Sequence, residues 1–225
     1  MGKEKRMTIF EHLDEFRSRL IKSVLALLVT TLFSLLFTSR FLKILTAPMG
    51  NLKPIFLRPT EMFITYMKVA LLSGLALAMP VLIYQLIRFL LPGLKPQERK
   101  YIYITVPGAT ISFVIGLAFA YFAILPFGIK YLLTFGGDIA RAQWTIGEYI
   151  TFGTTLLLGV GAVFETPLVM FFLAKIGIIN AQMLSHYRRY AIVAIAVIAA
   201  VITPTPDPFN MTLVMVPLFL LYDLG

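Results

Sequence analysis

The chain has 225 residues, of which 59% are hydrophobic and only 14% are charged, and its mean hydropathy is +0.86. This composition is typical of a polytopic membrane protein and leaves no room for a separate soluble domain. Because cysteine is absent, disulfides, thiolate metal sites and cysteine nucleophiles are excluded. We interpret the net charge of +9 as Lys and Arg flanking membrane spans beside anionic headgroups, and not as a surface for nucleic acid.

Residues 1–20 are predicted to form an amphipathic helix on the cytoplasmic membrane surface. Thr8 and Glu11 have the spacing of a capping box, and apolar residues recur on one helical face at Ile9, Leu13, Phe16 and Leu20. Glu15 lies on the other face, and its role has two interpretations that stay open here. It either forms a surface ion pair with Arg19, one turn further on, or belongs to a binding site.

Six apolar stretches follow and predict an all-α membrane protein, with spans at about 21–37, 69–87, 101–127, 149–174, 188–203 and 208–224. Three prolines in the stretch 203–208 split the last apolar region into a hairpin of two short helices. Such short helices should thin the bilayer locally or lie against a polar cavity. The first loop between spans contains Pro48, Pro54 and Pro59 among apolar residues, which predicts a packed cap.

The distribution of positive charge predicts the orientation of the chain. Counted over alternating segments, thirteen of the 20 Lys and Arg residues fall on the side that holds both termini. Because cytoplasmic loops carry the excess of Lys and Arg, both termini are expected in the cytoplasm.

Glu165 is the single ionisable residue of the fourth span, at 149–174, and Pro167 follows it closely. An ionised carboxylate facing lipid costs about 2.5 to 3.5 kcal/mol, so Glu165 is expected to face the bundle interior, a wet cavity or a partner. Pro167 removes a backbone donor and disfavours helical geometry in the residue before it, which predicts a bend near the charge. The alternative is a purely structural role, in which a neighbouring hydroxyl group or a water molecule hydrogen-bonds to the carboxyl group of Glu165.

Glu98 is a second acidic candidate, in the loop between the second and third spans. Pro96 and Glu98 suit the first and third positions of a helix, where the helix dipole stabilises a carboxylate, and this alone accounts for an acid there. The same position holds Glu98 near the inner surface, close to Glu15 if the spans pack together. Two carboxylates fixed in this way would form a site for a dibasic peptide.

The ordered combination of motifs along nearly the whole chain resembles the TatC family, the receptor subunit of the twin-arginine protein translocase. The motifs are His12-Leu-x-Glu15-x-Arg17-x-Arg19, Pro48, Pro59-x-Glu-x-Phe63 with Lys68, Pro80-Val-Leu-Ile-Tyr-Gln85, Phe89, Pro92, Glu98-Arg99, Phe164-Glu-x-Pro167, Tyr187-Arg-Arg-Tyr190 and Thr203-Pro-x-x-Asp207.

The resemblance implies a glove-shaped protein of six membrane helices with a concave face and cytoplasmic termini. It implies that Glu15 and Glu98 contact the arginine pair of a signal peptide, and that Arg17 belongs to the same site. Phe89 would either supply apolar contact beside the pair or pack at the membrane interface. Glu165 is expected in the concave membrane cavity, and the remaining family positions are Pro48, Phe63, Pro80 and Asp207. We expect Asp207 to cap the final helix, with Pro208 in the first helical position.

The resemblance also implies partners: twin-arginine signal peptides of folded precursors, and single-span subunits of the TatA and TatB type in a homo- and hetero-oligomer. The expected location is the bacterial or archaeal cytoplasmic membrane, or an organellar equivalent. Docking of the single-span subunits is expected on the short hairpin and the fourth span.

Other classes of function fit less well. A proton-coupled small-molecule transporter could use Glu165 as a relay, but no internal repeat is visible. An intramembrane enzyme needs a nucleophile, a base or a metal site, and His12 and His186 lie near span ends outside any HExxH or GxSxG motif. We therefore expect no enzymatic activity, no cofactor and no metal.

Overall fold

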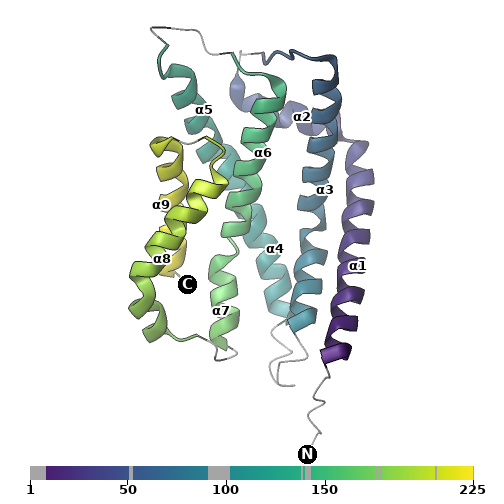
Figure 1. Ribbon diagram of the computed structural model, residues 1–225, viewed down its shortest axis with the longest axis vertical. Coiled ribbons are helices and arrows are strands. Elements are labelled where there is room, and N and C mark those ends of the chain that lie inside the picture. The colour runs from purple at the N-terminus through teal and green to yellow at the C-terminus, as the bar shows by residue number, and fades with distance from the viewer. Residues whose placement is uncertain are drawn as a thin grey trace, which may run out of the picture.

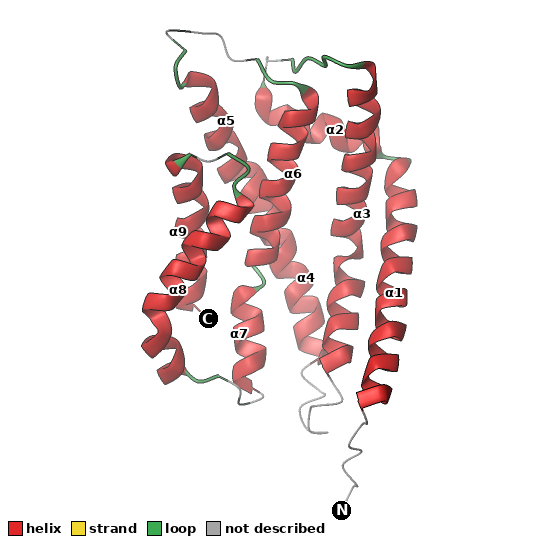
Figure 2. Cartoon of the chain, in the orientation of Figure 1, coloured by secondary structure: helices red, strands yellow, loops and turns green. Residues whose placement is uncertain are grey.

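The protein is described by a computed structural model, which covers residues 9–50, 53–90, 102–137, 139, 143–175, 177, 179–205 and 207–224. These described residues are helical apart from turns and connections, and their only β-type pairing is an isolated bridge between Ile55 and Thr145 (Figure 2). The predicted all-α class is confirmed. The capping residue Thr8 lies outside the described residues.

Most helices run along the long axis of the molecule (Figure 1). We call the side at which α1 begins the N side, and the opposite side the far side. The helices are α1 (Ile9–Leu35), α2 (Thr38–Thr46), a 3-10 turn η1 (Ala47–Met49), α3 (Pro59–Leu90), α4 (Ile102–Phe119), a π-helical turn (Ala120–Ile124), α5 (Leu125–Thr134), α6 (Ile146–Val163), α7 (Thr166–Lys175), α8 (Ala181–Ile202) and α9 (Pro208–Leu224).

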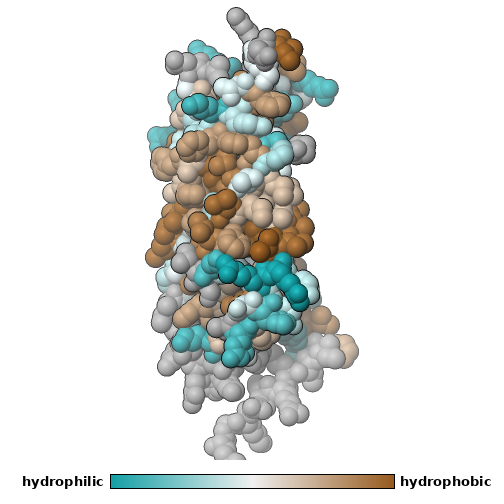
Figure 3. All heavy atoms as spheres, turned by 90° about the vertical axis from the view of Figure 1, so that its left-hand side faces the viewer, coloured by the Kyte–Doolittle hydropathy of each residue, from teal (hydrophilic) through white to brown (hydrophobic). Residues whose placement is uncertain are grey.

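Four described stretches are long and apolar enough to cross a membrane: Phe10–Leu35, Pro59–Phe89, Thr105–Thr134 and Ile146–Lys175. Helices α8 and α9 pack against each other as the expected hairpin. Helix α8 has 22 residues because it begins at Ala181, before the predicted span 188–203, with Asn180 as its N-cap; α9 has 17 residues. At about 1.5 Å per residue α9 is roughly 25 Å long, shorter than a hydrocarbon core of about 30 Å. Over this hairpin side of the molecule an apolar band lies between more polar surfaces (Figure 3). The exact limits of the membrane-embedded segments stay a prediction.

Helix α1 differs from the expected N-terminal arrangement. The amphipathic segment is helical from Ile9 on, but it continues without a break into the first span as one helix of 27 residues. It therefore does not turn along the membrane surface at Leu20. The physical reason is that no Gly or Pro occurs between Ile9 and Leu35, so nothing in the backbone interrupts the helical hydrogen bonds.

The bend predicted near Glu165 is confirmed. Helix α6 ends at Val163 and α7 begins at Thr166, so Phe164 and Glu165 form a turn inside the fourth span. Pro167 has no backbone N–H to continue the helical ladder. Ser112 on α4 donates its hydroxyl hydrogen to the carbonyl of Phe164 at 2.5 Å, which satisfies one acceptor at this break.

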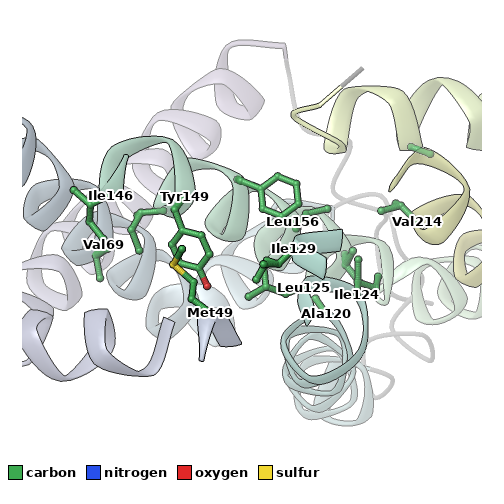
Figure 4. Close-up of a cluster of buried hydrophobic side chains, with 14 of the residues drawn as sticks. Met49, Val69, Ala120, Ile124, Leu125, Ile129, Ile146, Tyr149, Leu156 and Val214 are labelled. Carbon is green, nitrogen blue, oxygen red and sulfur yellow. The ribbon is translucent and has the colours of Figure 1, made fainter. Parts of the chain in front are cut away.

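The first loop between spans forms the predicted packed cap. Leu42 and Met49 are buried in the main apolar cluster, in which Figure 4 shows Met49 beside Tyr149. The hydroxyl of Tyr149 donates to the carbonyl of Leu45 at 2.6 Å, and the hydroxyl of Tyr121 donates to the carbonyl of Ile44 at 2.8 Å. Two spans therefore hold the cap through its backbone, at the far side.

Candidate functional site

The N-side ends of α1 and α3 bring together a carboxylate, a guanidinium and an amide. Arg19 donates from Nη2 to Oε1 of Glu15 at 3.1 Å and from Nη1 to Oε1 of Gln85 on α3 at 3.2 Å. The exposed fractions of the side chains are 16% for Glu15 and 19% for Arg19, and Gln85 is buried. The ion pair that the sequence left open is thus formed, in a largely buried setting where charges interact more strongly than at a free surface.

This ion pair leaves hydrogen-bonding capacity unused. Oε2 of Glu15 and Nε of Arg19 are buried and have no hydrogen-bond partner among the described residues. A carboxylate can accept two parallel hydrogen bonds from one guanidinium, but Arg19 engages only one carboxylate oxygen because its other Nη is held by Gln85. Glu15 is therefore a partly satisfied acceptor at the edge of the helix pair.

An aromatic cluster lies beside the ion pair. The ring of Phe89 on α3 stacks on the ring of His12 with centroids 4.6 Å apart, and meets Phe16 edge-on at 5.5 Å. His12, Glu15, Phe16 and Arg19 share the face of α1 that contacts α3, because their spacings are three and four residues. The predicted site residues Glu15 and Phe89 are thus on adjacent elements.

A cavity of about 360 Å³ extends from this cluster towards the fourth span. Its lining includes Arg19, Gln85 and Phe89 at one end and Glu165 from the α6–α7 break, with mostly apolar residues between them. Oε1 of Glu165 is buried without a hydrogen-bond partner among the described residues. The structure therefore places Glu165 on the wall of the same cavity as Arg19, which the sequence alone did not indicate.

Two other candidates for the same site have different positions. Arg17 is exposed and lies two residues from Glu15, on another face of α1. Glu98 lies outside the described residues, so its predicted proximity to Glu15 stays a prediction.

The remaining family positions lie elsewhere in the fold. Pro48 is the middle residue of the η1 turn of the far-side cap, Phe63 is exposed in the first turns of α3, and Pro80 lies within the uninterrupted helix α3. Asp207 caps α9 as expected, because its Oδ1 accepts the backbone N–H of Asn210 at 2.7 Å. These positions do not join the cluster around Glu15.

Glu61 connects the first residues of α3 and α6 at the far side, a role that no local sequence pattern indicated. Its Oε1 accepts the backbone N–H of Gly147 at 2.9 Å, and its Oε2 accepts the backbone N–H of Leu57 at 3.0 Å. The partner at Gly147 is 86 residues away, so no local pattern could have revealed it. The available signals were an acidic residue in the first turn of α3 and its place in the family motif Pro59-x-Glu-x-Phe63.

The arrangement around Glu15 offers groups that are suited to binding. It offers a buried carboxylate, an amide and aromatic surface, which together match a guanidinium with an apolar neighbour. Among the described residues, no group of three His, Asp or Glu side chains is placed to hold a metal ion.

Comparisons with known proteins place this arrangement in a family. The profile of the family described as "Sec-independent protein translocase protein (TatC)" matches residues 11–217. The chain belongs to the TatC family. A "Sec-independent protein translocase protein TatC" of Carboxydothermus hydrogenoformans is 40% identical over 224 residues, which cover 99% of this chain and 92% of that protein. The chloroplastic relative of Arabidopsis thaliana is 34% identical over 97% of this chain and 65% of its own length.

A solved structure supports the same assignment. The "Crystal Structure of Twin Arginine Translocase Receptor- TatC" superposes with a TM-score of 0.84 at 35% identity, and the match covers 95% of this chain and 96% of that one. This member of the TatC family is thus a multi-pass membrane component of a protein translocase, with the six-helix, glove-shaped architecture that the sequence predicted.

Proposed function

We propose that this protein is the receptor for twin-arginine signal peptides of folded precursors, and that it binds one arginine of the pair at Glu15. The observation that carries the proposal is the free Oε2 of Glu15, which is buried beside Arg19 without a partner among the described residues. An incoming guanidinium would satisfy this oxygen. Phe89 and Phe16 would cover the apolar part of the bound segment.

The chemistry of the site explains why arginine would be selected over lysine. A guanidinium presents donors in a planar fork that matches a carboxylate, whereas an ammonium is a compact point charge. Arg19 already uses this fork to reach Glu15 and Gln85 at once. We propose that Glu98 supplies the second carboxylate, so that two arginines meet two acids.

Assembly of the translocation complex would use a different part of the molecule. A chain with six membrane helices cannot enclose a folded domain, so transport requires further subunits, which we propose are single-span subunits of the TatA and TatB type. Their docking surface would be α8, α9 and the fourth span, where Oε1 of Glu165 has no hydrogen-bond partner in the described part of the chain. The N side would face the cytoplasm, as the distribution of Lys and Arg predicts.

Binding of signal peptides to the purified protein tests the receptor proposal. Glu15→Gln and Glu98→Gln should each weaken binding of an Arg-Arg peptide by about 1.5 kcal/mol, roughly tenfold, because each removes a charge-assisted acceptor and keeps its shape. Asp14→Asn is the matched control, since Asp14 is an exposed acid adjacent to Glu15 and is expected to change little. A Lys-Lys peptide should bind weakly to all forms. Unchanged affinity in both glutamine variants would reject the receptor site.

A variant of Arg19 tests whether this residue competes with the peptide for Glu15 or orients Glu15 for the peptide. If Arg19 occupies part of the acceptor that the peptide needs, Arg19→Gln should raise affinity at least about two- to threefold, because one hydrogen bond to Glu15 is freed for the peptide. If Arg19 instead orients Glu15 for the peptide, the same variant should lower affinity. The sign of the change therefore assigns the role of Arg19 independently of the glutamine variants at the acids.

A further inference from the structure

A second cavity, of about 820 Å³, lies at the far side of the molecule, remote from Glu15. Its walls are the first turns of α3, the first turns of α6, Leu132 on α5 and the turn between α8 and α9, which contributes Pro204 and Thr205. The residues of the Glu15 site do not line this cavity.

The cavity reaches from the far-side ends of α3 and α6 to the turn between α8 and α9. In Figure 1 the turn between α8 and α9 is well below the level at which α3 and α6 begin. Lys68 is nine residues into α3, about 13 Å along the helix axis from Pro59, yet it lines the same cavity as the α8–α9 turn. Lys68 thus lines the cavity together with the hairpin turn, near which the short helix α9 would draw the membrane boundary towards the N side.

The four charged side chains of the cavity differ in how many hydrogen bonds they make within the protein. Lys68 donates from Nζ to Oγ1 of Thr151 at 3.0 Å, which uses one of the three donors of an ammonium group. Both carboxylate oxygens of Glu61 accept backbone N–H groups. Arg58 and Glu148 are exposed, and Glu148 lies one turn before Thr151 on α6. The two basic and two acidic side chains sum to zero net charge.

The rest of the lining has the character of a lipid site. Ile64, Leu132 and Phe152 give the cavity an apolar wall, and Trp144, an aromatic residue typical of membrane interfaces, stands in the same lining. A free phosphate ion would gain no favourable contact from these apolar side chains. An amphiphile with charges of both signs at one end matches both the apolar wall and the balanced charges.

We propose that this cavity binds the headgroup of a phospholipid of the far-side leaflet, of the phosphoethanolamine class. The phosphate would lie against Lys68 and Arg58, and the ammonium group against Glu148. Thr151 and Glu148 are neighbours on one face of α6, so the two charges of the headgroup meet adjacent positions. An acyl chain would follow Ile64 and Phe152 towards the bilayer interior.

Native mass spectrometry of the purified full chain tests this proposal. The protein is extracted from vesicles that contain equal amounts of phosphatidylethanolamine and phosphatidylglycerol with identical acyl chains, and the retained lipids are counted. We expect phosphatidylethanolamine to be retained in several-fold excess. Lys68→Gln should reduce its retention about three- to tenfold, the effect of losing one charge-assisted contact.

Two further variants sharpen the test. Glu148→Gln should abolish the preference between the two lipids while leaving total retention nearly unchanged, because only the ammonium contact is lost. Lys130→Gln on α5 removes an exposed lysine that does not line the cavity, and should leave both values unchanged. Equal retention of the two lipids by the unmodified protein, or equal losses in the Lys68 and Lys130 variants, would overturn the proposal.

Discussion

Asp207 joins the α8–α9 turn to α9 through both of its carboxylate oxygens. Oδ1 accepts the backbone N–H of Asn210, and Oδ2 accepts the side-chain amide of Asn210 at 2.9 Å. Asp207→Ala removes both hydrogen bonds and should lower the free energy of unfolding by about 1 to 2 kcal/mol. Asp207→Asn keeps the cap but turns a donor towards the donating amide of Asn210, so we expect a loss of about 0.5 kcal/mol. Thermal unfolding in detergent measures both.

The stability that the hydrogen bonds of Asp207 contribute should depend on pH. Burial acts to raise the pKa of Asp207, but hydrogen bonds from the Asn210 backbone and from the Thr205 and Asn210 side chains outweigh it and hold the pKa below its usual range. Because the folded pKa is the lower one, this stabilisation is present above the unfolded pKa and is lost as pH falls through the folded pKa. The difference in stability between the native protein and Asp207→Asn should therefore shrink in acid. A difference that grows in acid would contradict this account.

Residue roles could be predicted where the partner is close in sequence. The cap at Asp207 and the possible pair of Glu15 with Arg19 both follow from spacings of three and four residues. The bonds of Tyr149 to Leu45 and of Glu61 to Gly147 span 104 and 86 residues, and depend on how the spans pack. No periodicity in the chain reports such pairings.

Contact between α1 and α3 depends on the absence of a side chain at Gly74. A Cβ atom at Gly74 would lie 2.6 Å from Cα of Thr31 on α1, so the two backbones would have to move apart. Gly74→Ala should therefore lower the free energy of unfolding by about 1 to 3 kcal/mol. The same shift would move Phe89 on α3 away from Glu15 on α1, so affinity for an Arg-Arg peptide should fall as well. Unfolding and peptide titration on one preparation measure both effects.

Gly153→Ala on α6 is the matched control for this change. Its added Cβ would lie 3.5 Å from the nearest atom, a methyl carbon of Leu125, which is ordinary contact. Because the residue is helical and buried, the variant should be neutral or slightly stabilising. Equal losses in the two variants would show that the close approach at Gly74 is not what holds α1 against α3.

The ends of helices could be predicted from the sequence where a proline determines them. Pro167 identified the break between α6 and α7, and the prolines around Asp207 identified the hairpin turn. Pro80 lies within α3 without ending it, because membrane helices tolerate proline when other groups satisfy the freed carbonyl. The π-helical turn at Ala120–Ile124 was not predicted, since its apolar sequence is as compatible with ordinary α-helix.

At the scale of the whole molecule, two groups of polar side chains line cavities at opposite sides. The Glu15 cluster and Glu165 share the N-side cavity, whereas Glu61, Lys68 and Glu148 gather at the far side. The apolar interior between them is formed by residues from the cap and nearly every span, as Figure 4 illustrates. Because an unpaired polar group in such an interior is costly, each group has to be either satisfied within the protein or offered to a ligand.

Glu165 is the residue at which this principle leads to a prediction for the complete complex. The hydrogen bonds among Glu15, Arg19 and Gln85 do not involve Glu165. Glu165→Gln and Glu165→Ala should therefore leave affinity for an Arg-Arg signal peptide within about twofold, a change near 0.4 kcal/mol. Both variants should impair assembly with single-span subunits, since a polar group on a partner helix loses its carboxyl contact.

The defect should be graded, because glutamine keeps the size of the side chain and an acceptor oxygen, whereas alanine removes the contact altogether. Two measurements on each variant test the prediction: signal-peptide affinity in detergent, and site-directed cross-linking from the α8–α9 hairpin to a single-span subunit in membranes. Cross-linking should fall moderately for Glu165→Gln and strongly for Glu165→Ala. If Glu165→Ala abolished peptide binding and left the cross-links intact, the shared cavity would link Glu165 to recognition at Glu15, and the proposed separation of recognition from assembly would be wrong.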